Sequence, residues 1–354
     1  MKLGIIGMPQ SGKTTIFNAL TRGDTPTTMS GGRVEVHTAM VDVPDARLER
    51  LSVIFQPKKT TFARVEYADI AGLDGSTGQS GISGQLLNEL SQMDGFLHVV
   101  RAFEDESVAH QSGSVDPGRD IASMQSELLL NDMIAVERKL ERLADERQKG
   151  GRDKTIVERE QGLFQRLQTV LNDEVPLRDV ELSLEEIKEV SGYGFLTLKP
   201  MLVVLNLAEG QPAPDLAPME HSRVVPLQGK LEMEIAQLPS DEALAFLAEY
   251  GIEEPSLYRM IRESYKLLGL LSFFTVEGDE VRAWMVRRGA AAPEAAGVVH
   301  TDMQRGFIRA EVIPFTELDV LGSLAAAREA GKLRVEGKDY LVQDGDVIRV
   351  RFNV

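Results

Sequence analysis

The sequence predicts an α/β fold that carries a helical insertion and ends in a small α+β domain. Three short, mostly apolar runs, at residues 3–6, 96–100 and 201–205, are typical of parallel strands covered on both faces. A highly charged segment with helical periodicity lies between the last two runs, and short strand-like pieces follow Tyr265. The length of 354 residues is enough for two or three domains.

The first part of the chain alternates between predicted strands and helices. A glycine-rich turn follows residues 3–6, and a helical pattern then runs from Thr14 to Leu20. Residues 62–69 predict another strand, because apolar and charged side chains alternate there. Strands that alternate with helices in this way indicate a doubly wound sheet.

Residues 120–190 predict two antiparallel amphipathic helices. Apolar side chains recur at three- and four-residue steps among many charges, and residues 150–153 (GGRD) break the repeat. The heavily charged faces favour a coiled-coil-like arm. The alternative is a pair of ordinary helices packed on the core. The repeating apolar positions are Met133, Val136, Leu140, Leu143, Leu163, Leu167, Val170 and Leu171.

The segment after Tyr265 predicts a separate α+β domain of about 80 residues. Strand-like pieces at 273–276, 281–284 and 308–313 alternate with turns, and one helical segment at about 321–331 interrupts them.

Composition and charge exclude several classes of function. The net charge of −16 argues against wrapping duplex DNA. The absence of cysteine excludes disulfides and thiolate metal sites, and the five histidines show no metal-ligand spacing. The chain lacks an apolar run of about 18 residues, and its apolar start is too short for a signal peptide. We therefore expect a cytoplasmic protein that binds neither DNA nor a membrane. We also expect a monomer, although no feature of the sequence fixes the oligomeric state.

Residues 7–14 (GMPQSGKT) match the phosphate-binding pattern G-x-x-x-x-G-K-[ST] in full, between a strand and a helix. The glycines let successive N–H groups point at phosphate oxygens, and the helix N-terminus adds the positive end of its dipole. Lys13 would neutralise the β- and γ-phosphates, and the hydroxyl of Thr14 would ligate Mg²⁺. The expected nucleotide-binding residues of this segment are Gly7, Gln10, Ser11, Gly12, Lys13, Thr14 and Thr15.

A second anchor is the D-x-x-G string at residues 69–72, which follows the strand predicted at 62–69. In a protein with this phosphate loop, Asp69 would hold Mg²⁺, usually through water, and the N–H of Gly72 would contact the γ-phosphate. The alternative is a plain strand-ending turn.

A third anchor is the string at residues 206–209 (NLAE), directly after an apolar strand. GTPases place N-K-x-D there, where the Asp accepts from guanine and the Lys stem covers the base. Leu207 replaces that Lys, and Glu209 replaces the Asp with a side chain one methylene longer. A guanine-specific contact would therefore be misplaced, which predicts relaxed or switched base choice at the site that Asn206, Leu207 and Glu209 would form. The alternative is an ordinary strand-to-loop exit.

These motifs resemble those of the YchF or Obg-like ATPase family. The resemblance covers nearly the full length and includes residues 98–105 (HVVRAFED). It is strongest at residues 271–275 (LSFFT), 296–302 (AGVVHTD), 306–311 (GFIRAE) and 336–340 (EGKDY).

The resemblance implies three domains. These are a P-loop NTPase G domain of TRAFAC type at residues 1–115 and 196–270, a helical coiled-coil insertion at 116–195, and a β-grasp-like TGS domain at 271–354. It also implies ATP in preference to GTP, slow hydrolysis and association with the ribosome.

The water-activating residue departs from the Ras-like pattern. Leu73 stands where Ras-like proteins carry a glutamine, and an apolar side chain cannot hydrogen-bond the attacking water. The resemblance implies a histidine before the helical insertion as the substitute, which is His110 here. The alternative is a solvent-exposed loop histidine. Together with Lys13 and Gly72, His110 makes up the expected catalytic set.

Other positions also depart from the family pattern. Arg33 stands at the position of the switch I threonine. Gln10 replaces an asparagine that can help to hold K⁺, which leaves potassium activation open. Gln228 and Gly229 replace Ser-Ala and are expected to line the nucleotide site.

We therefore expect a Mg²⁺-dependent ATPase that acts as a nucleotide-dependent switch and associates with the ribosome or ribosomal RNA. One alternative is a nucleotide-gated ribosome- or RNA-binding module with negligible hydrolysis, and another is a GTPase. Basic side chains after Tyr265 could contact RNA phosphates or could simply be solvated. They are Arg282, Arg287, Arg288, Arg305 and Arg309.

Overall fold

The structure is a computed structural model of the whole chain. It describes residues 1–25, 36–70, 82, 84–108, 110–216, 223–250, 252 and 254–353. Backbone contacts divide the chain into two compact units. Unit 1 contains residues 1–39 and 66–257, and unit 2 contains residues 40–65 and 258–354. Each unit is described by itself below.

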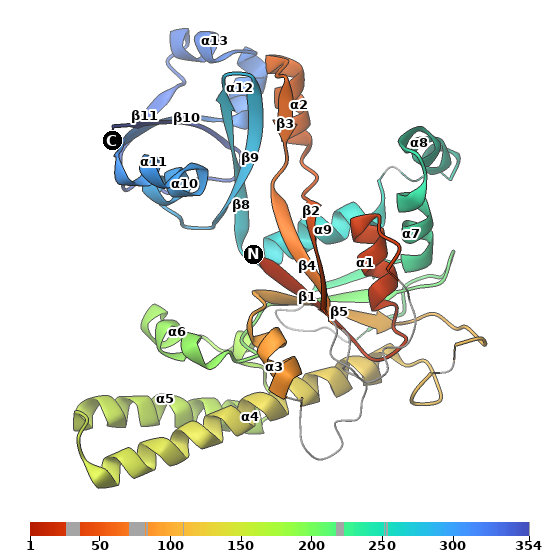
Figure 1. The fold of residues 1–354 in the computed structure, drawn as a ribbon, viewed down its shortest axis with the longest axis vertical. Coiled ribbons are helices and arrows are strands. Elements are labelled where there is room, and N and C mark those ends of the chain that lie inside the picture. Colours follow the sequence, from red (N-terminus) through yellow and green to blue (C-terminus); the bar gives the residue numbers. More distant parts are fainter. Residues whose placement is uncertain are drawn as a thin grey trace. The chain divides into compact units, whose positions relative to one another are not determined.

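Unit 1 is built on a six-stranded sheet with the order β2-β4-β1-β5-β6-β7 (Figure 1). Its strands from β4 to β7 in this order all pair in parallel. The order reverses at β1, whose neighbours β4 and β5 lie on opposite sides. A crevice for a ligand is expected at such a point, outside the carboxyl ends of the strands. The strands are β1 (Lys2–Ile6), β2 (Val36–Asp42), β4 (Arg64–Ile70), β5 (Gly95–Arg101), β6 (Met201–Asn206) and β7 (Arg223–Leu227).

Helices cover both faces of this sheet. Apolar side chains of α3 (Gly84–Ser91) and α4 (Pro117–Lys149) form one buried cluster with strand residues such as Phe96. Figure 1 shows α1 (Lys13–Thr21) and α7 (Gly229–Gln237) on the opposite side. The central strands are buried throughout, which explains their nearly continuous apolar sequences. The strands and the helix predicted in this part are confirmed, with β4 beginning at Arg64.

The helical insertion consists of α4 and α5 (Lys154–Asn172), which run side by side in opposite directions (Figure 1). The side chain of Asp116 caps α4 and that of Asp153 caps α5, each by accepting a backbone N–H. Gly150, with φ 67°, ends α4, so the turn lies where the GGRD string predicted it. Two short 3₁₀ turns, Leu177–Asp179 and Ser191–Tyr193, and α6 (Leu184–Val190) follow.

The helix α4 contributes side chains to two separate hydrophobic cores. Both interpretations of the insertion, a coiled-coil-like arm and helices packed on the core, therefore apply to different parts of it. Met124 and Leu128 pack in the cluster beneath the sheet. Farther along, Val136 joins Phe164 and Leu167 of α5 in a separate buried cluster. Part of α4 is therefore a core-packed helix, and the rest pairs with α5 as the predicted arm.

Two more helices complete this part of the chain. They are α8 (Ser240–Glu249) and α9 (Ser256–Leu267), and α9 crosses the boundary between the units at residue 257.

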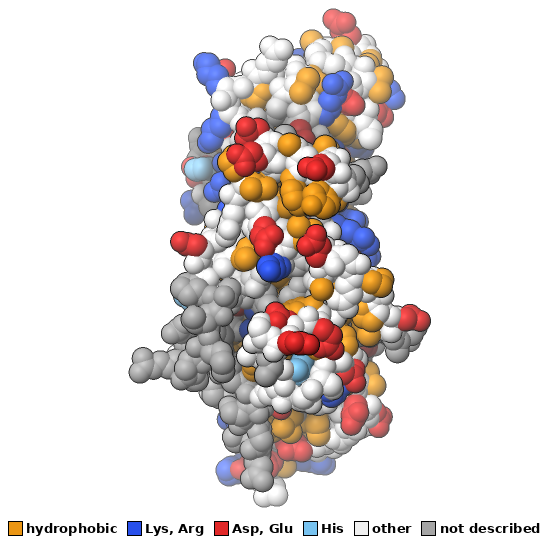
Figure 2. All heavy atoms as spheres, turned by 90° about the vertical axis from the view of Figure 1, so that its right-hand side faces the viewer, with side chains coloured by type: hydrophobic (Ala, Val, Ile, Leu, Met, Phe, Trp, Pro, Cys, Tyr) orange, Lys and Arg blue, Asp and Glu red, His pale blue; other side chains and the backbone are white. Residues whose placement is uncertain are grey.

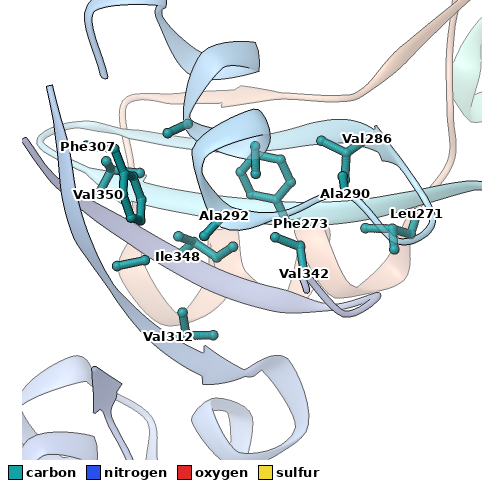
Figure 3. Close-up of a cluster of buried hydrophobic side chains, with 13 residues drawn as sticks. Leu271, Phe273, Val286, Ala290, Ala292, Phe307, Val312, Val342, Ile348 and Val350 are labelled. Atoms are coloured by element: carbon teal, nitrogen blue, oxygen red, sulfur yellow. The ribbon is translucent and has the colours of Figure 1, made fainter. Parts of the chain in front are cut away.

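Unit 2 is an α+β structure around a mixed six-stranded sheet with the order β11-β10-β12-β8-β9-β3. Parallel pairs (β12–β8 and β3–β9) occur beside antiparallel ones. Figure 3 shows its buried cluster, in which Phe273 and Leu271 face Ile348, Val342 and Ala292. The strands are β3 (Lys59–Thr61), β8 (Leu270–Glu277), β9 (Glu280–Arg287), β10 (Phe307–Pro314), β11 (Arg334–Glu336) and β12 (Asp346–Phe352).

The helices of unit 2 differ in part from the sequence prediction. The helical segment predicted at about 321–331 corresponds to one helix, Leu324–Glu329. A separate helix, Phe315–Leu321, precedes it and was not predicted, and Gly322 ends this helix with φ 71°. Two further helices lie at residues 292–305, where the sequence analysis named no helix. The helices are α2 (Ala46–Phe55), α10 (Ala292–Val299), α11 (Thr301–Arg305), α12 (Phe315–Leu321) and α13 (Leu324–Glu329).

The compact units do not follow the predicted domain bounds. The helical insertion falls within unit 1, and residues 40–65 fall with the C-terminal segment in unit 2. This division by backbone contacts does not test the three predicted domains, so their bounds at residues 115, 195 and 270 stay a prediction. None of the described helices has the length and apolar character needed to cross a membrane.

Candidate nucleotide-binding site

The phosphate loop joins the carboxyl end of β1 to the first turn of α1. Ile5 lies beside Asp69 of β4, and Ile6 lies beside His98 of β5. Residues 7–12 therefore lie at the carboxyl end of β1, where the strand order reverses and a ligand crevice is expected. The backbone N–H groups of the first turn of α1 face this end of the sheet, since they lack partners within the helix.

At two positions of the loop, other atoms lie so close to the backbone that only glycine fits. A Cβ atom on Gly7 would overlap the carbonyl oxygen of Val99 and would lie 2.8 Å from Ser11 Oγ. Gly12 has φ 94°, and a Cβ atom there would overlap the side-chain amide of Asn206. Larger residues would displace the loop from the neighbouring strands, so its curvature depends on both glycines.

The ammonium group of Lys13 folds back over the loop. Its Nζ donates to the carbonyl oxygens of Gly7 and Met8, both at 3.0 Å. These contacts hold a positive charge at the mouth of the loop, where the phosphates of a nucleotide are expected. The predicted contact of Lys13 with the β- and γ-phosphates stays a prediction.

Thr14 and Asp69 meet at the predicted metal position. The hydroxyl of Thr14 donates to Asp69 Oδ2 at 2.8 Å. The other carboxylate oxygen, Oδ1, is buried and accepts no hydrogen bond from the described residues. Burial raises the pKa of Asp69, while the bond from Thr14 and the charges of Lys13 and His37 oppose that shift.

This oxygen pair fits a hard divalent cation. In the described part of the chain, no three His, Asp or Glu side chains gather into a metal cage. A cation here would be held by one carboxylate, one hydroxyl, water and nucleotide oxygens, which is the usual way that proteins bind Mg²⁺. The Oδ1 atom of Asp69, which has no partner among the described residues, is the atom that such a cation would contact.

Asn206 links the phosphate loop to the segment at residues 228–229, which is one of two predicted to lie beside the nucleotide base. The other is residues 206–209, and both are called base-side segments below. Its Nδ2 donates to the carbonyl oxygen of Ser11 at 3.0 Å, and its Oδ1 accepts the backbone N–H of Gly229 at 3.0 Å. The side chain is buried, with 4% of the residue exposed. The role of Asn206 in this structure is therefore to position two loops, with both ends of its amide already in use.

The other predicted base-side residues lie around Asn206 but differ in exposure. Leu207 is buried in a hydrophobic cluster and donates its backbone N–H to Leu227. Glu209 is exposed, and Gln228 precedes the first turn of α7 without capping it by its side chain. Glu209 is therefore the member of the N-x-x-E string whose side chain is open to a ligand.

His110 is engaged with its own segment. Its Nδ1 accepts the backbone N–H of Ser112 at 3.1 Å, and its Nε2 lies 3.0 Å from Asp120 Oδ2. Because Nδ1 accepts, Nε2 carries the proton and donates to Asp120. The side chain is 8% exposed, so it is not the exposed loop histidine of the alternative reading. Neither ring nitrogen is left to orient a water molecule in this arrangement.

Several predicted site residues take no side-chain part in these contacts, or lie outside the described residues. Thr15 belongs to the first turn of α1. Gln10 adopts φ 61° at the tip of the loop. Gly72, Leu73 and Arg33 fall outside the described residues, so their predicted roles stay predictions.

Sequence reasoning missed three buried or bridging residues near the site. His98 is fully buried beside the start of the loop. Arg101 ends β5 next to Asn206, and its guanidinium donates to backbone carbonyls of residues 103, 105 and 108. Gln211 joins the base-side turn to β5. The string at residues 98–105, which the family resemblance includes, contains His98 and Arg101 but gave neither of them a role.

Two family models match the chain. Residues 2–139 match the model described as 50S ribosome-binding GTPase. Residues 270–353 match the model YchF-GTPase_C, described as a protein of unknown function (DUF933).

Relatives match over the full length. The chain is 42% identical over 363 residues to the ribosome-binding ATPase YchF of Pasteurella multocida, covering 100% of this chain and 99% of that one. It is 36% identical over 367 residues to Obg-like ATPase 1 of Oryza sativa subsp. japonica, covering 100% and 92%. The solved structure of the Schizosaccharomyces pombe YchF GTPase superposes with a TM-score of 0.84 at 28% identity, covering 99% of this chain and 97% of that one.

Proposed function

The chain belongs to the YchF family of ATPases, and from this premise we propose that it hydrolyses ATP with Mg²⁺ and prefers ATP to GTP. The observation that carries the proposal is the arrangement of Lys13, Thr14 and Asp69 around the phosphate loop. A cation, a hydroxyl and a carboxylate there meet the needs of phosphoryl transfer from a triphosphate to water.

Each of these residues has a distinct task. Lys13 is already held over the loop by two carbonyls, so little side-chain freedom is lost when it binds phosphate. Thr14 and Asp69 would hold Mg²⁺, which supplies charge neutralisation on the β- and γ-phosphates when bound. The loop N–H groups would bind the phosphate oxygens and orient the chain of phosphates for in-line attack.

The base preference rests on the apolar Leu207 and the exposed Glu209. Leu207 packs in the core and offers no cation beside the base. A carboxylate only accepts hydrogen bonds, and adenine and guanine differ in where they present donors. Competition between ATP and GTP for one site on the wild-type protein measures this preference directly.

The substitution Lys13→Ala tests the hydrolysis. Removing one preorganised donor of this kind lowers turnover by about 100-fold or more. Lys154→Ala is the matched control, since the Lys154 side chain is 78% exposed on α5. Phosphate release would be measured for both variants and the wild type. Full hydrolysis by the Lys13 variant would refute the proposal.

A second candidate, a nucleotide-gated binding module with negligible turnover, is favoured by the state of His110. Both of its ring nitrogens are engaged, and the side chain is nearly buried. In a single-turnover assay with excess protein, rapid phosphate release would exclude this candidate. Nucleotide binding without release would favour it over the ATPase.

Ribosome binding is the function named for the bacterial relatives, and we extend it to this chain. Residues 258–354 contain 14 basic and 14 acidic residues, so this segment lacks the strong negative charge of the whole chain. On the face drawn in Figure 2, basic side chains are interspersed with acidic and hydrophobic ones among the coloured residues. Arg287, Arg288, Arg305 and Arg309 are exposed in unit 2. Co-sedimentation of the wild type and the Lys13 variant with ribosomes, with ATP or ADP, tests this extension.

A further inference from the structure

The segment that carries Glu209 is a closed turn. The backbone N–H of Gln211 donates to the carbonyl oxygen of Ala208 at 3.2 Å. The Gln211 side chain folds back, and its Oε1 accepts the backbone N–H of Ala208 at 2.9 Å. Gly210 adopts φ 69°, which a glycine allows without strain. Glu209 and Gly210 therefore stand at the tip of a turn that is closed from both sides.

The other end of the Gln211 amide attaches this turn to the sheet. Its Nε2 donates to the carbonyl oxygen of Ala102 at 2.7 Å, directly after β5. The backbone N–H of Ala102 donates in turn to the carbonyl oxygen of Asn206 at 2.9 Å. The turn is thus fixed at its start through Asn206 and at its end through Gln211.

The attachment point is itself rigid. Arg101 is 3% exposed, and its guanidinium donates to the carbonyl oxygens of Phe103 and Val108 at 3.1 and 2.9 Å. It also lies over the ring of Phe103, 4.6 Å from the centroid. These contacts fix the course of the chain after β5, so the carbonyl of Ala102 is a firm anchor for Gln211.

We propose that Gln211 is a positioning residue for base selection, which holds the 208–211 turn against Ala102 and thereby sets where Glu209 presents its carboxylate. This inference rests on the proposed function, because it assumes that the base is read at this turn. Glu209 is exposed and makes no hydrogen bond or ion pair with the described residues, so only the turn backbone fixes its place. Discrimination by a hydrogen bond depends on such placement.

The test compares Gln211→Met, which keeps the side-chain length and removes both hydrogen bonds, with Gln211→Glu. The glutamate can still accept from Ala208 but cannot donate to Ala102. Gln148→Met, at an exposed position of α4, is the control. For each full-length protein, dissociation constants are measured with Mg²⁺ for ATP, GTP and inorganic tripolyphosphate, which reports on the phosphate loop alone.

We expect the ratio of the dissociation constant for GTP to that for ATP to fall about five- to tenfold in Gln211→Met, which loses both hydrogen bonds. The fall should be smaller in Gln211→Glu, which keeps the bond from Ala208. Tripolyphosphate affinity should stay within about twofold of wild type, because Lys13 and its loop are untouched. The control should keep the wild-type ratio.

Three results would overturn the inference, and they can be told apart. An unchanged ratio in both Gln211 variants, with wild-type selectivity present, would refute the role of Gln211 alone. If a Gln211 variant loses as much affinity for tripolyphosphate as for ATP, the substitution disturbs the phosphate loop and does not act on base recognition. A wild-type protein without base preference would refute the proposed preference itself, and the inference with it.

Discussion

His98 is a buried titratable side chain that lies beside the start of the phosphate loop. It is fully buried on β5, and neither ring nitrogen has a hydrogen-bond partner among the described residues. Burial, together with the charges of Lys13 and Arg178, lowers its pKa from 6.5 to about 3. The imidazole is therefore neutral in the folded protein at any pH where the protein would work.

This state makes stability depend on pH. Below pH 6.5 the unfolded chain binds a proton at His98 that the folded chain does not bind until about pH 3. The folded state accordingly loses stability as the pH falls through this window, by about 1.4 kcal/mol at pH 5.5. Urea unfolding of wild type and His98→Leu at pH 7.5 and 5.5 measures the difference. An equal pH response of both proteins would contradict it.

The residues of the site differ in how far sequence alone could place them. The phosphate loop and the carboxylate of Asp69 were predictable, because the spacing of Gly7, Gly12 and Lys13 has one physical cause. The bonds of Asn206 and Gln211 were not, since they join backbone groups that are distant in sequence. No local pattern records which carbonyl a side-chain amide will reach.

The helical insertion was predictable as an element, because its apolar repeat and its glycine break are local signals. The hydrophobic core of the insertion also includes residues from other parts of the sequence, which local signals do not reveal. Phe164 of α5 packs against Tyr193 and Phe195, with ring centroids 5.0 and 6.3 Å apart, and lies under the ammonium of Lys139. The aromatic residues that close this core come from beyond both helices.

Phe164→Ala should therefore loosen the arm without disturbing the nucleotide site. A buried aromatic side chain replaced by alanine costs about 3–5 kcal/mol, because a cavity remains. Hydrogen exchange should rise in α5 and the outer part of α4, while ATP affinity stays near wild type. Ile156→Ala is the control on the same helix, since Ile156 is 44% exposed. If hydrogen exchange in the arm of the Phe164 variant is as slow as in the wild type, the prediction is wrong.

The organisation of the whole chain departs from its order in sequence. Residues 40–65, which run from the end of β2 to the start of β4, belong to the same compact unit as the C-terminal segment. Within that unit β3 pairs with β9, and Arg47 donates to Asp344 at 2.8 Å. Such contacts join residues almost 300 positions apart and leave no periodicity or motif, so the sequence analysis included residues 40–65 in the G domain that the family resemblance implies.

Unit 2 should therefore depend on an arginine from the first sixth of the chain. Arg47 also pairs with Asp45 and lies over the ring of Phe274, 5.3 Å from its centroid. Asp344 in turn accepts the backbone N–H of Ser272 in β8. Removing the guanidinium leaves both carboxylates without their cation and uncovers the ring, so we expect Arg47→Met to destabilise unit 2 by about 1–2 kcal/mol.

Arg50→Met is the matched control, because Arg50 lies on the same helix and its side chain is 53% exposed, against 29% for Arg47. An exposed pair contributes about 0.2–1 kcal/mol, so the control should show the smaller loss. Hydrogen exchange measured on the full-length protein locates the effect. In Arg47→Met, exchange should rise in β8 and around residue 344, although the substitution lies almost 300 positions away. If protection from exchange is lost only within residues 40–65, the contacts of that segment do not stabilise the C-terminal sheet, and the prediction is wrong.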